Sequence, residues 1–217
     1  MTLLFPRLVS RVRVALDQNQ GEMPLLANDE HTLEVYDIIR ASLLRASRWV
    51  LERAPLELVD THKDFGTVGA STDESGRLEL ALPSDWLRLW SMKISSWRVP
   101  VRACFPADSE ASLLAVSDFA GVRPCADRPM AVDDGVTLTL YGSPGTLEHA
   151  EYIAMPRVYD NNKIDLPERL VDAIVLFAAG LTSDALHDEQ HGVALKQSAM
   201  GFMGVAPREE KPDKKEQ

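Results

Sequence analysis

The stretch GRLELALPSDWLRLWSMKI, residues 76–94, predicts a β module inside a chain whose two ends are helical in pattern. Residues 77–82 alternate between polar and apolar side chains, as in a strand with one buried face. The Leu-Pro-Ser-Asp sequence at 82–85 then predicts a turn. We expect a short amphipathic piece carrying Trp86, Leu87 and Leu89 after the turn, and a second strand after that piece.

Helical periodicity marks both ends of the chain. Apolar residues recur every three or four positions over 6–18 and 29–53, and the same spacing returns over 165–186 and 193–203. Residues 170–181 are apolar on nearly every side, which is typical of a helix that is buried all round. Helices from the two ends of the chain are therefore expected to pack together.

The region between these helices has the shorter period of β-strands. Strands are predicted over 56–59, 77–82, 92–97, 99–104, 136–141 and 148–155, with the last two forming a hairpin and a short helix at 109–116. The sequence thus predicts an α+β fold. Residues 1–55 and 156–205 would form a helical bundle, residues 56–155 an inserted and mostly antiparallel β module, and residues 206–217 a flexible charged tail.

Composition and charge exclude several classes of protein. The formal net charge of −10 argues against a protein that grips nucleic acid by neutralising phosphates, although a carboxylate-lined wall past which DNA slides remains compatible. No apolar run is long enough to span a bilayer, and the N-terminus lacks the layout of a signal peptide. Cys104 and Cys125 lack metal-ligand spacing. We expect a soluble intracellular product with reduced thiols.

The search for chemistry finds one enzymatic alternative. His187 and His191 are four residues apart, so on one helix they would share a face, as zinc ligands require. However, Asp188 replaces the glutamate of a zincin motif, no third ligand is indicated, and Gly192 is expected to break the helix. A polar helix end explains the same residues. We predict no catalytic residue, no metal and no cofactor.

Tryptophans are the most conspicuous side chains of the predicted module. Trp86, Trp90 and Trp97 cluster around its turn without the interleaved basic residues of single-strand nucleic-acid binders. Packing in a core or in a subunit interface is therefore the favoured interpretation.

The order of elements and short motifs resembles one protein family. A long helix over 29–53 is followed by Leu-Pro-x-Asp-Trp at 82–86, by an Arg-Pro-rich approach at 123–129, by strands over 137–141 and 151–156, and by an Ala-rich helix over 170–186. This layout resembles the head-to-tail connector, or adaptor, proteins of tailed phages, particularly short-tailed viruses and related prophages. The resemblance covers about residues 25–200.

The resemblance implies a structural virion protein of the neck or tail that is not an enzyme. Copies would form a homo-oligomeric ring, usually a dodecamer, beneath the portal protein; during assembly they would be in the host cytoplasm. The ring would extend the channel for genomic DNA, which would pass through without specific binding, and it would dock downstream tail or nozzle proteins, with no membrane contact. Twelve copies would carry about −120 in charge, which suits a lumen that must not trap DNA.

The resemblance also directs attention to an interface for neighbouring subunits and for the portal. The residues expected there are Trp86, Trp90, Leu170, Ile174, Phe177, Leu181, Pro207, Arg208 and Lys211. Another tail-completion or stopper protein is the nearest alternative, since it would also lack a catalytic site. A metal-dependent enzyme using His187 and His191 is the alternative from a different class.

Overall fold

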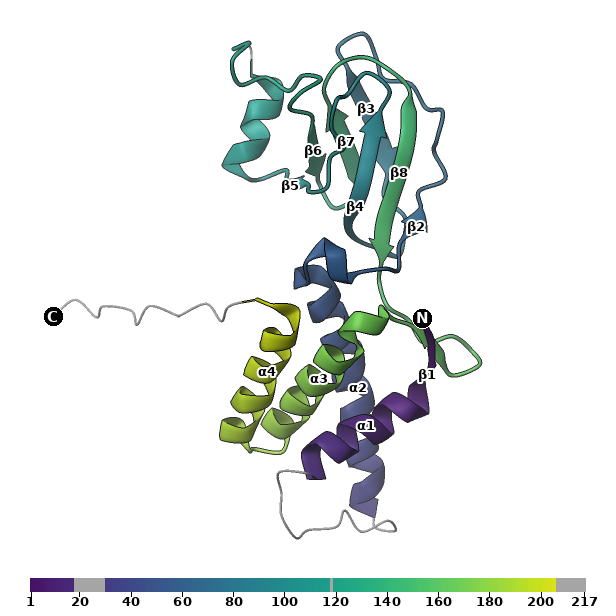
Figure 1. Ribbon diagram of the computed structural model, residues 1–217, viewed down its shortest axis with the longest axis vertical. Helices are drawn as coiled ribbons and strands as arrows, with labels where there is room; N and C mark the ends of the chain where they lie inside the picture. Colours follow the sequence, from purple (N-terminus) through teal and green to yellow (C-terminus); the bar gives the residue numbers. More distant parts are fainter. Residues whose placement is uncertain (18–29, 118, 206–217) are drawn as a thin grey trace, which may run out of the picture. The chain divides into compact units, whose positions relative to one another are not determined.

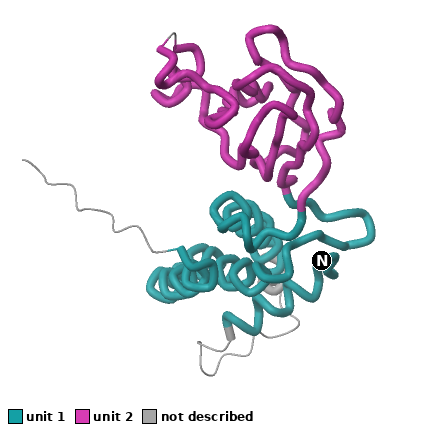
Figure 2. The backbone as a smooth tube through the Cα atoms, turned by 45° about the horizontal axis from the view of Figure 1, so that its top comes forward, with its two compact units in different colours: residues 1–61, 156–217 teal, residues 62–155 magenta. Residues whose placement is uncertain are grey.

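The computed structural model describes residues 1–17, 30–117 and 119–205. It has the α+β fold that the sequence predicts, with the helices at the two ends of the chain and most of the strands between them (Figure 1). The chain divides into two compact units: residues 1–61 and 156–217 form a helical unit, and residues 62–155 form a β unit (Figure 2). The predicted tail at 206–217 lies outside the described residues.

Four helices build the helical unit: α1 (Phe5–Asp17), α2 (Glu30–Arg53), α3 (Val171–Ala185) and α4 (Glu189–Met203). Helix α3 packs against the other three helices, because it is apolar on nearly all sides. A two-stranded antiparallel sheet links the N-terminal segment to the segment before α3, with β1 (Thr2–Leu4) beside β9 (Lys163–Asp165). Two short 3₁₀ helices complete the unit, η1 (Leu56–Leu58) and η3 (Glu168–Leu170).

Two sheets build the β unit. The first has the strand order β2–β8–β4, with β2 (Lys63–Asp64), β8 (Leu147–Ala154) and β4 (Trp86–Ile94). The second has the order β3–β7–β6–β5, with β3 (Arg77–Ala81), β7 (Thr137–Tyr141), β6 (Met130–Asp133) and β5 (Phe105–Pro106). All of these pairings are antiparallel except β5 with β6. Both sheets contribute to one hydrophobic core.

Several sequence predictions are confirmed at the level of single elements. The alternating stretch forms β3, with Leu78 and Leu80 buried, and the turn before it contains Gly76 at φ +81°. The short helix at 109–116 is a 3₁₀ helix, η2 (Glu110–Val116), and the Ser109 side chain caps its start by accepting a hydrogen bond from the backbone N–H of Ser112.

Other predictions about elements are wrong. The expected amphipathic piece after the Leu-Pro-Ser-Asp turn is part of β4, which runs through it without interruption as far as Ile94, with three register shifts against β8. The predicted hairpin does not form, because β7 pairs with β3 and β6 while β8 pairs with β4 and β2. The predicted strand at 56–59 is the 3₁₀ helix η1. Residues 99–104 contribute one isolated bridge, at Val101.

Candidate interaction surfaces

Asp85, in the turn before β4, ties together three strands of the β unit. Its carboxylate accepts hydrogen bonds from Lys63 Nζ on β2 at 2.6 Å and from the Tyr152 hydroxyl on β8 at 2.8 Å. Its carbonyl oxygen accepts a third, from the backbone N–H of Met155 at 2.6 Å. Burial alone would raise the pKa of Asp85, but the bonds from Lys63 and Tyr152 outweigh burial and lower it. The Leu-Pro-Ser-Asp-Trp stretch therefore serves first as an internal anchor.

The two tryptophans expected at an interface contact residues of their own β unit. Trp86 stacks on Tyr152 with 5.8 Å between ring centroids, and its Nε1 donates to Asp133 Oδ2 at 3.0 Å. Trp90 stacks on the imidazole of His62 with 4.9 Å between centroids and 5° between the ring planes. Both side chains are half-buried. Trp86 therefore packs the turn against strand β8 of its own β unit.

The four expected interface residues of the 170–181 segment lie in the helical unit. Leu170 and Ile174 are 0% exposed and Phe177 is 6% exposed, and Phe177 stacks on Trp49 of α2 with 4.0 Å between centroids. The helices of the same chain cover these three side chains, so they present no surface to a neighbouring subunit. Leu181 is half-buried. The other three expected residues, Pro207, Arg208 and Lys211, lie outside the described residues.

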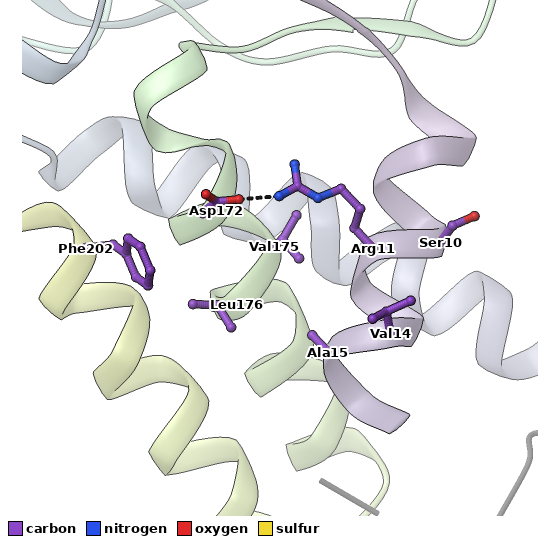
Figure 3. A pocket seen from close by; sticks show the side chains of 8 residues that line it. All are labelled: Ser10, Arg11, Val14, Ala15, Asp172, Val175, Leu176 and Phe202. Carbon is purple, nitrogen blue, oxygen red and sulfur yellow. Dashed lines mark hydrogen bonds and ion pairs between the residues drawn. The ribbon is translucent and has the colours of Figure 1, made fainter. Parts of the chain in front are cut away.

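An open groove lies on the helical unit where α1, α3 and α4 meet (Figure 3). Its volume is about 370 Å³, and it is lined by Ser10, Arg11, Val14, Ala15, Asp172, Val175, Leu176 and Phe202. Phe202 comes from α4, Leu176 from α3 and Val14 from α1, and an ion pair between Arg11 and Asp172 crosses the groove. Val14 is 53% exposed and Phe202 59% exposed, so apolar surface at this groove faces solvent.

A second apolar surface lies on the β unit, at and after η2. We call it the apolar patch and define it as Leu113, Leu114, Val116, Phe119 and Val122. In Figure 1 the short helix after β5 stands beside the sheet that contains β5 and β6. All five side chains are exposed, and Phe119, at 79%, is the most exposed large apolar residue in the described ranges. Five exposed apolar side chains within one short segment make this segment a candidate interaction site.

The two histidines of the enzymatic alternative do not share a helix face. His187 lies between α3 and α4 with φ +66°, and His191 lies in the first turn of α4, whose start is capped by Asp188. Gly192 does not break the helix; it lies inside α4. Within the described ranges no group of three or more His, Cys, Asp or Glu side chains is placed to hold a metal ion.

The two cysteines are free thiols in different surroundings. Burial, with a further contribution from the Asp133 carboxylate, raises the pKa of Cys104. Hydrogen bonds from the backbone N–H groups of Asp127 and Arg128 lower the pKa of Cys125. Neither thiol lies at the groove or in the apolar patch.

Sequence reasoning missed both apolar surfaces. The apolar run at 113–116 suggested a short helix, but nothing in the run shows that its side chains stay uncovered. The groove combines residues from α1 with residues more than 150 positions later in the chain, so only tertiary packing reveals it. A half-buried glutamate and two histidines, Glu151 with His62 and His149, form a further polar cluster at the first sheet, with N–O distances of 3.5 and 3.2 Å.

Comparisons with known proteins add no relative. No protein-family model matches the chain, and no curated protein matches it significantly. In the described part of the chain, no helix has both the length and the apolar character needed to cross a membrane. The observations that bear on function are therefore the two-unit architecture and the two exposed apolar surfaces.

Proposed function

We propose that this protein is a head-to-tail connector subunit of a tailed-phage virion, assembled as a ring beneath the portal protein. The observation that carries the proposal is the architecture: four helices from both ends of the chain form one unit, and a β unit is inserted between them. The resemblance to connectors covers this order of elements from the long helix α2 through the inserted β unit to the Ala-rich helix α3, and α1 lies outside it. The ring is proposed to be a dodecamer in the neck of the virion, with tail or nozzle proteins docked below it.

Exposed apolar surface supports an assembly role. The groove and the apolar patch lie on different units of one chain and involve different side chains. A cyclic head-to-tail ring needs two different surfaces on each subunit, because each subunit contacts its two neighbours through unlike faces. A chain with two separate apolar surfaces meets that requirement.

The net negative charge of the chain supports a channel wall that DNA passes without being bound. With a formal charge of −10 per chain, a ring would repel the phosphates of a duplex in its channel at low salt. We therefore expect no measurable affinity for double-stranded DNA at physiological ionic strength, where a protein that contacts six to ten phosphates would bind.

The direct test is native mass spectrometry of the purified protein, alone and mixed with the portal protein encoded in the same genome. We expect either a ring of fixed copy number or a monomer that joins the portal in a fixed multiple. The control is a portal protein from an unrelated phage, which should bind no copies. A chain that forms no ring alone and no complex with its own portal protein would refute the proposal.

The same experiment separates the connector from a stopper or tail-completion protein. A connector binds the portal directly, whereas a protein placed lower in the neck would bind only after another component has covered the portal. Adding the remaining neck and tail proteins one at a time therefore identifies the layer to which this chain belongs.

A further inference from the structure

We infer that the apolar patch of one copy of this chain occupies the groove between α1, α3 and α4 of a second copy. The inference deepens the proposed function and rests on it for the expectation that the contacts close into a ring. It names the two surfaces through which neighbouring subunits would meet, and it places neither of them at the residues expected from the sequence.

The side chains of the apolar patch are exposed in the single chain, as expected for residues that become buried only when a partner binds. Leu113 is 67%, Val116 71% and Phe119 79% exposed. Two hydrogen bonds fix the start of η2, since the Ser109 hydroxyl accepts the backbone N–H of Ser112 and the Ser112 hydroxyl donates to the carbonyl of Ala107 at 2.8 Å. A preformed segment loses less conformational freedom on docking than a flexible one.

The groove has the size and lining to receive such a segment. Its volume of about 370 Å³ is within the range of sites that hold small ligands, roughly 300–1,000 Å³. Val14, Leu176 and Phe202 supply apolar contacts from three helices (Figure 3). The Arg11–Asp172 ion pair satisfies both charged groups, so an apolar side chain could lie beside it without leaving a single charge unpaired.

Local charge favours a second copy as the occupant. Helix α1 carries Arg7, Arg11 and Arg13 and ends at Asp17, and Arg11 is paired with Asp172. Asp108 precedes η2 and Glu110 is its first residue, with Arg123 beyond the far end of the patch. Two chains with a formal charge of −10 repel each other overall, so an acidic segment meeting a basic helix is the arrangement that reduces that repulsion.

Phe119 is 79% exposed and Phe202 59% exposed, so each surface is open to a partner. Because patch and groove are unlike surfaces, the contact is heterologous, and repeated use of it gives a closed ring or an open filament.

The experiment uses two charge variants of the full chain, Phe119→Asp in the patch and Phe202→Asp in the groove. Sedimentation velocity and native mass spectrometry would follow self-association from low concentration up to about 1 mM. We expect each variant alone to associate at least about 10-fold more weakly than the wild type. An equimolar mixture should form 1:1 heterodimers and nothing larger, since it retains one intact patch facing one intact groove.

Matched controls place the same charge on exposed valines outside both surfaces. Val136→Asp, at a 73% exposed site of the β unit, and Val193→Asp, at a 46% exposed site of α4, should associate like the wild type. Near-ultraviolet circular dichroism checks that each variant is folded. Leu113→Asp and Val14→Asp replace any variant that is not, because they lie on the same two surfaces.

Three results would overturn the inference: a wild-type chain that stays monomeric at every concentration, variants that associate like the wild type, or a mixture that behaves as the sum of its monomers. Its failure is distinguishable from failure of the proposed function. A wild-type chain that binds the portal but does not self-associate would leave the function standing and remove this contact, whereas self-association without portal binding would do the opposite.

Discussion

At Asp85, one partly buried carboxylate accepts hydrogen bonds from side chains of two other strands, Lys63 on β2 and Tyr152 on β8. Its side chain is 21% exposed, whereas that of Lys63 is 42% exposed, so solvent screens part of the ion pair. Asp85 therefore stabilises the fold through the two hydrogen bonds together, because removing the carboxylate deprives both donors of this acceptor.

We predict that Asp85→Asn destabilises the protein by about 1–2 kcal/mol, because the amide cannot accept from both donors as a carboxylate does. Urea unfolding at neutral pH measures the change. Glu148→Gln is the matched control, since Glu148 pairs with Lys93 at 3.6 Å with a 50% exposed side chain and should change stability by no more than about 0.5 kcal/mol. Equal effects of the two substitutions would contradict the anchor role.

The effect of Asp85→Asn should depend on pH. The folded protein lowers the pKa of Asp85, so the ionised carboxylate contributes stability above its unfolded pKa, about 3.9, and that stability is lost as the pH falls through the folded value. The difference in unfolding free energy between wild type and variant should therefore be constant near neutrality and shrink below about pH 4. A difference that grows on acidification would reverse the assigned sign.

Single residues also show where sequence reasoning reaches its limit. The spacing of His187 and His191 suggested a shared helix face, but the chain turns at His187 with a left-handed backbone. Spacing places two side chains on one face only if the helix continues between them. The partners of Asp85 lie 22 and 67 residues away, and no local pattern identifies them.

At the scale of elements, Gly192 lies where α3 and α4 pack closely against each other. A Cβ atom on Gly192 would lie 2.2 Å from Asp184 Oδ1 and 2.9 Å from the carbonyl oxygen of Gly180. Asp184 in turn holds Lys196 Nζ at 2.7 Å. The glycine inside α4 therefore permits helix packing, and its presence in the sequence does not end the helix.

We predict that Gly192→Ala destabilises the helical unit by about 1–3 kcal/mol, because the helices must separate or the Asp184–Lys196 pair must shift. Gly201→Ala on the same helix is the control. A Cβ there meets nothing within 4 Å, so the better helix propensity of alanine should stabilise the protein by up to about 0.5–1 kcal/mol. Thermal unfolding of both variants should give shifts of opposite sign; shifts of the same sign would contradict this packing.

The elements were predictable to different degrees for physical reasons. The strand at 77–82 and the helix at 6–18 were predicted because one buried face imposes a clear period on each. The stretch at 86–94 did not show such a period, because three register shifts in β4 break the alternation of its side chains. The predicted hairpin was wrong because strands that are neighbours in sequence are usually expected to pair, whereas β8 pairs with β4, which lies more than 50 residues earlier in the chain.

At the scale of the whole molecule, the β unit has its own core. Its buried side chains come from both sheets, and all of them belong to residues between 65 and 152. All strand partners of β2 to β8 likewise lie within residues 62–155. A contiguous segment that contains its own core and its own pairings is expected to fold by itself.

We predict that a fragment of residues 62–155 folds without the helical unit. Amide resonances should be dispersed in a ¹H–¹⁵N correlation spectrum, and urea unfolding should be cooperative. Leu138→Asp, at a fully buried position of β7, is the control and should abolish the dispersion. A wild-type fragment with the collapsed spectrum of an unfolded chain would show that the β unit needs the helices.

The pairing of β1 with β9 implies an order of events during synthesis on the ribosome. The partners of Thr2–Leu4, Lys163–Asp165, are made about 160 residues later. Every strand of the β unit can find its partners before then, since domains fold as units while the chain grows at about 5–20 residues per second. Strand β1 therefore remains unpaired until the β unit between β1 and β9 has had time to fold.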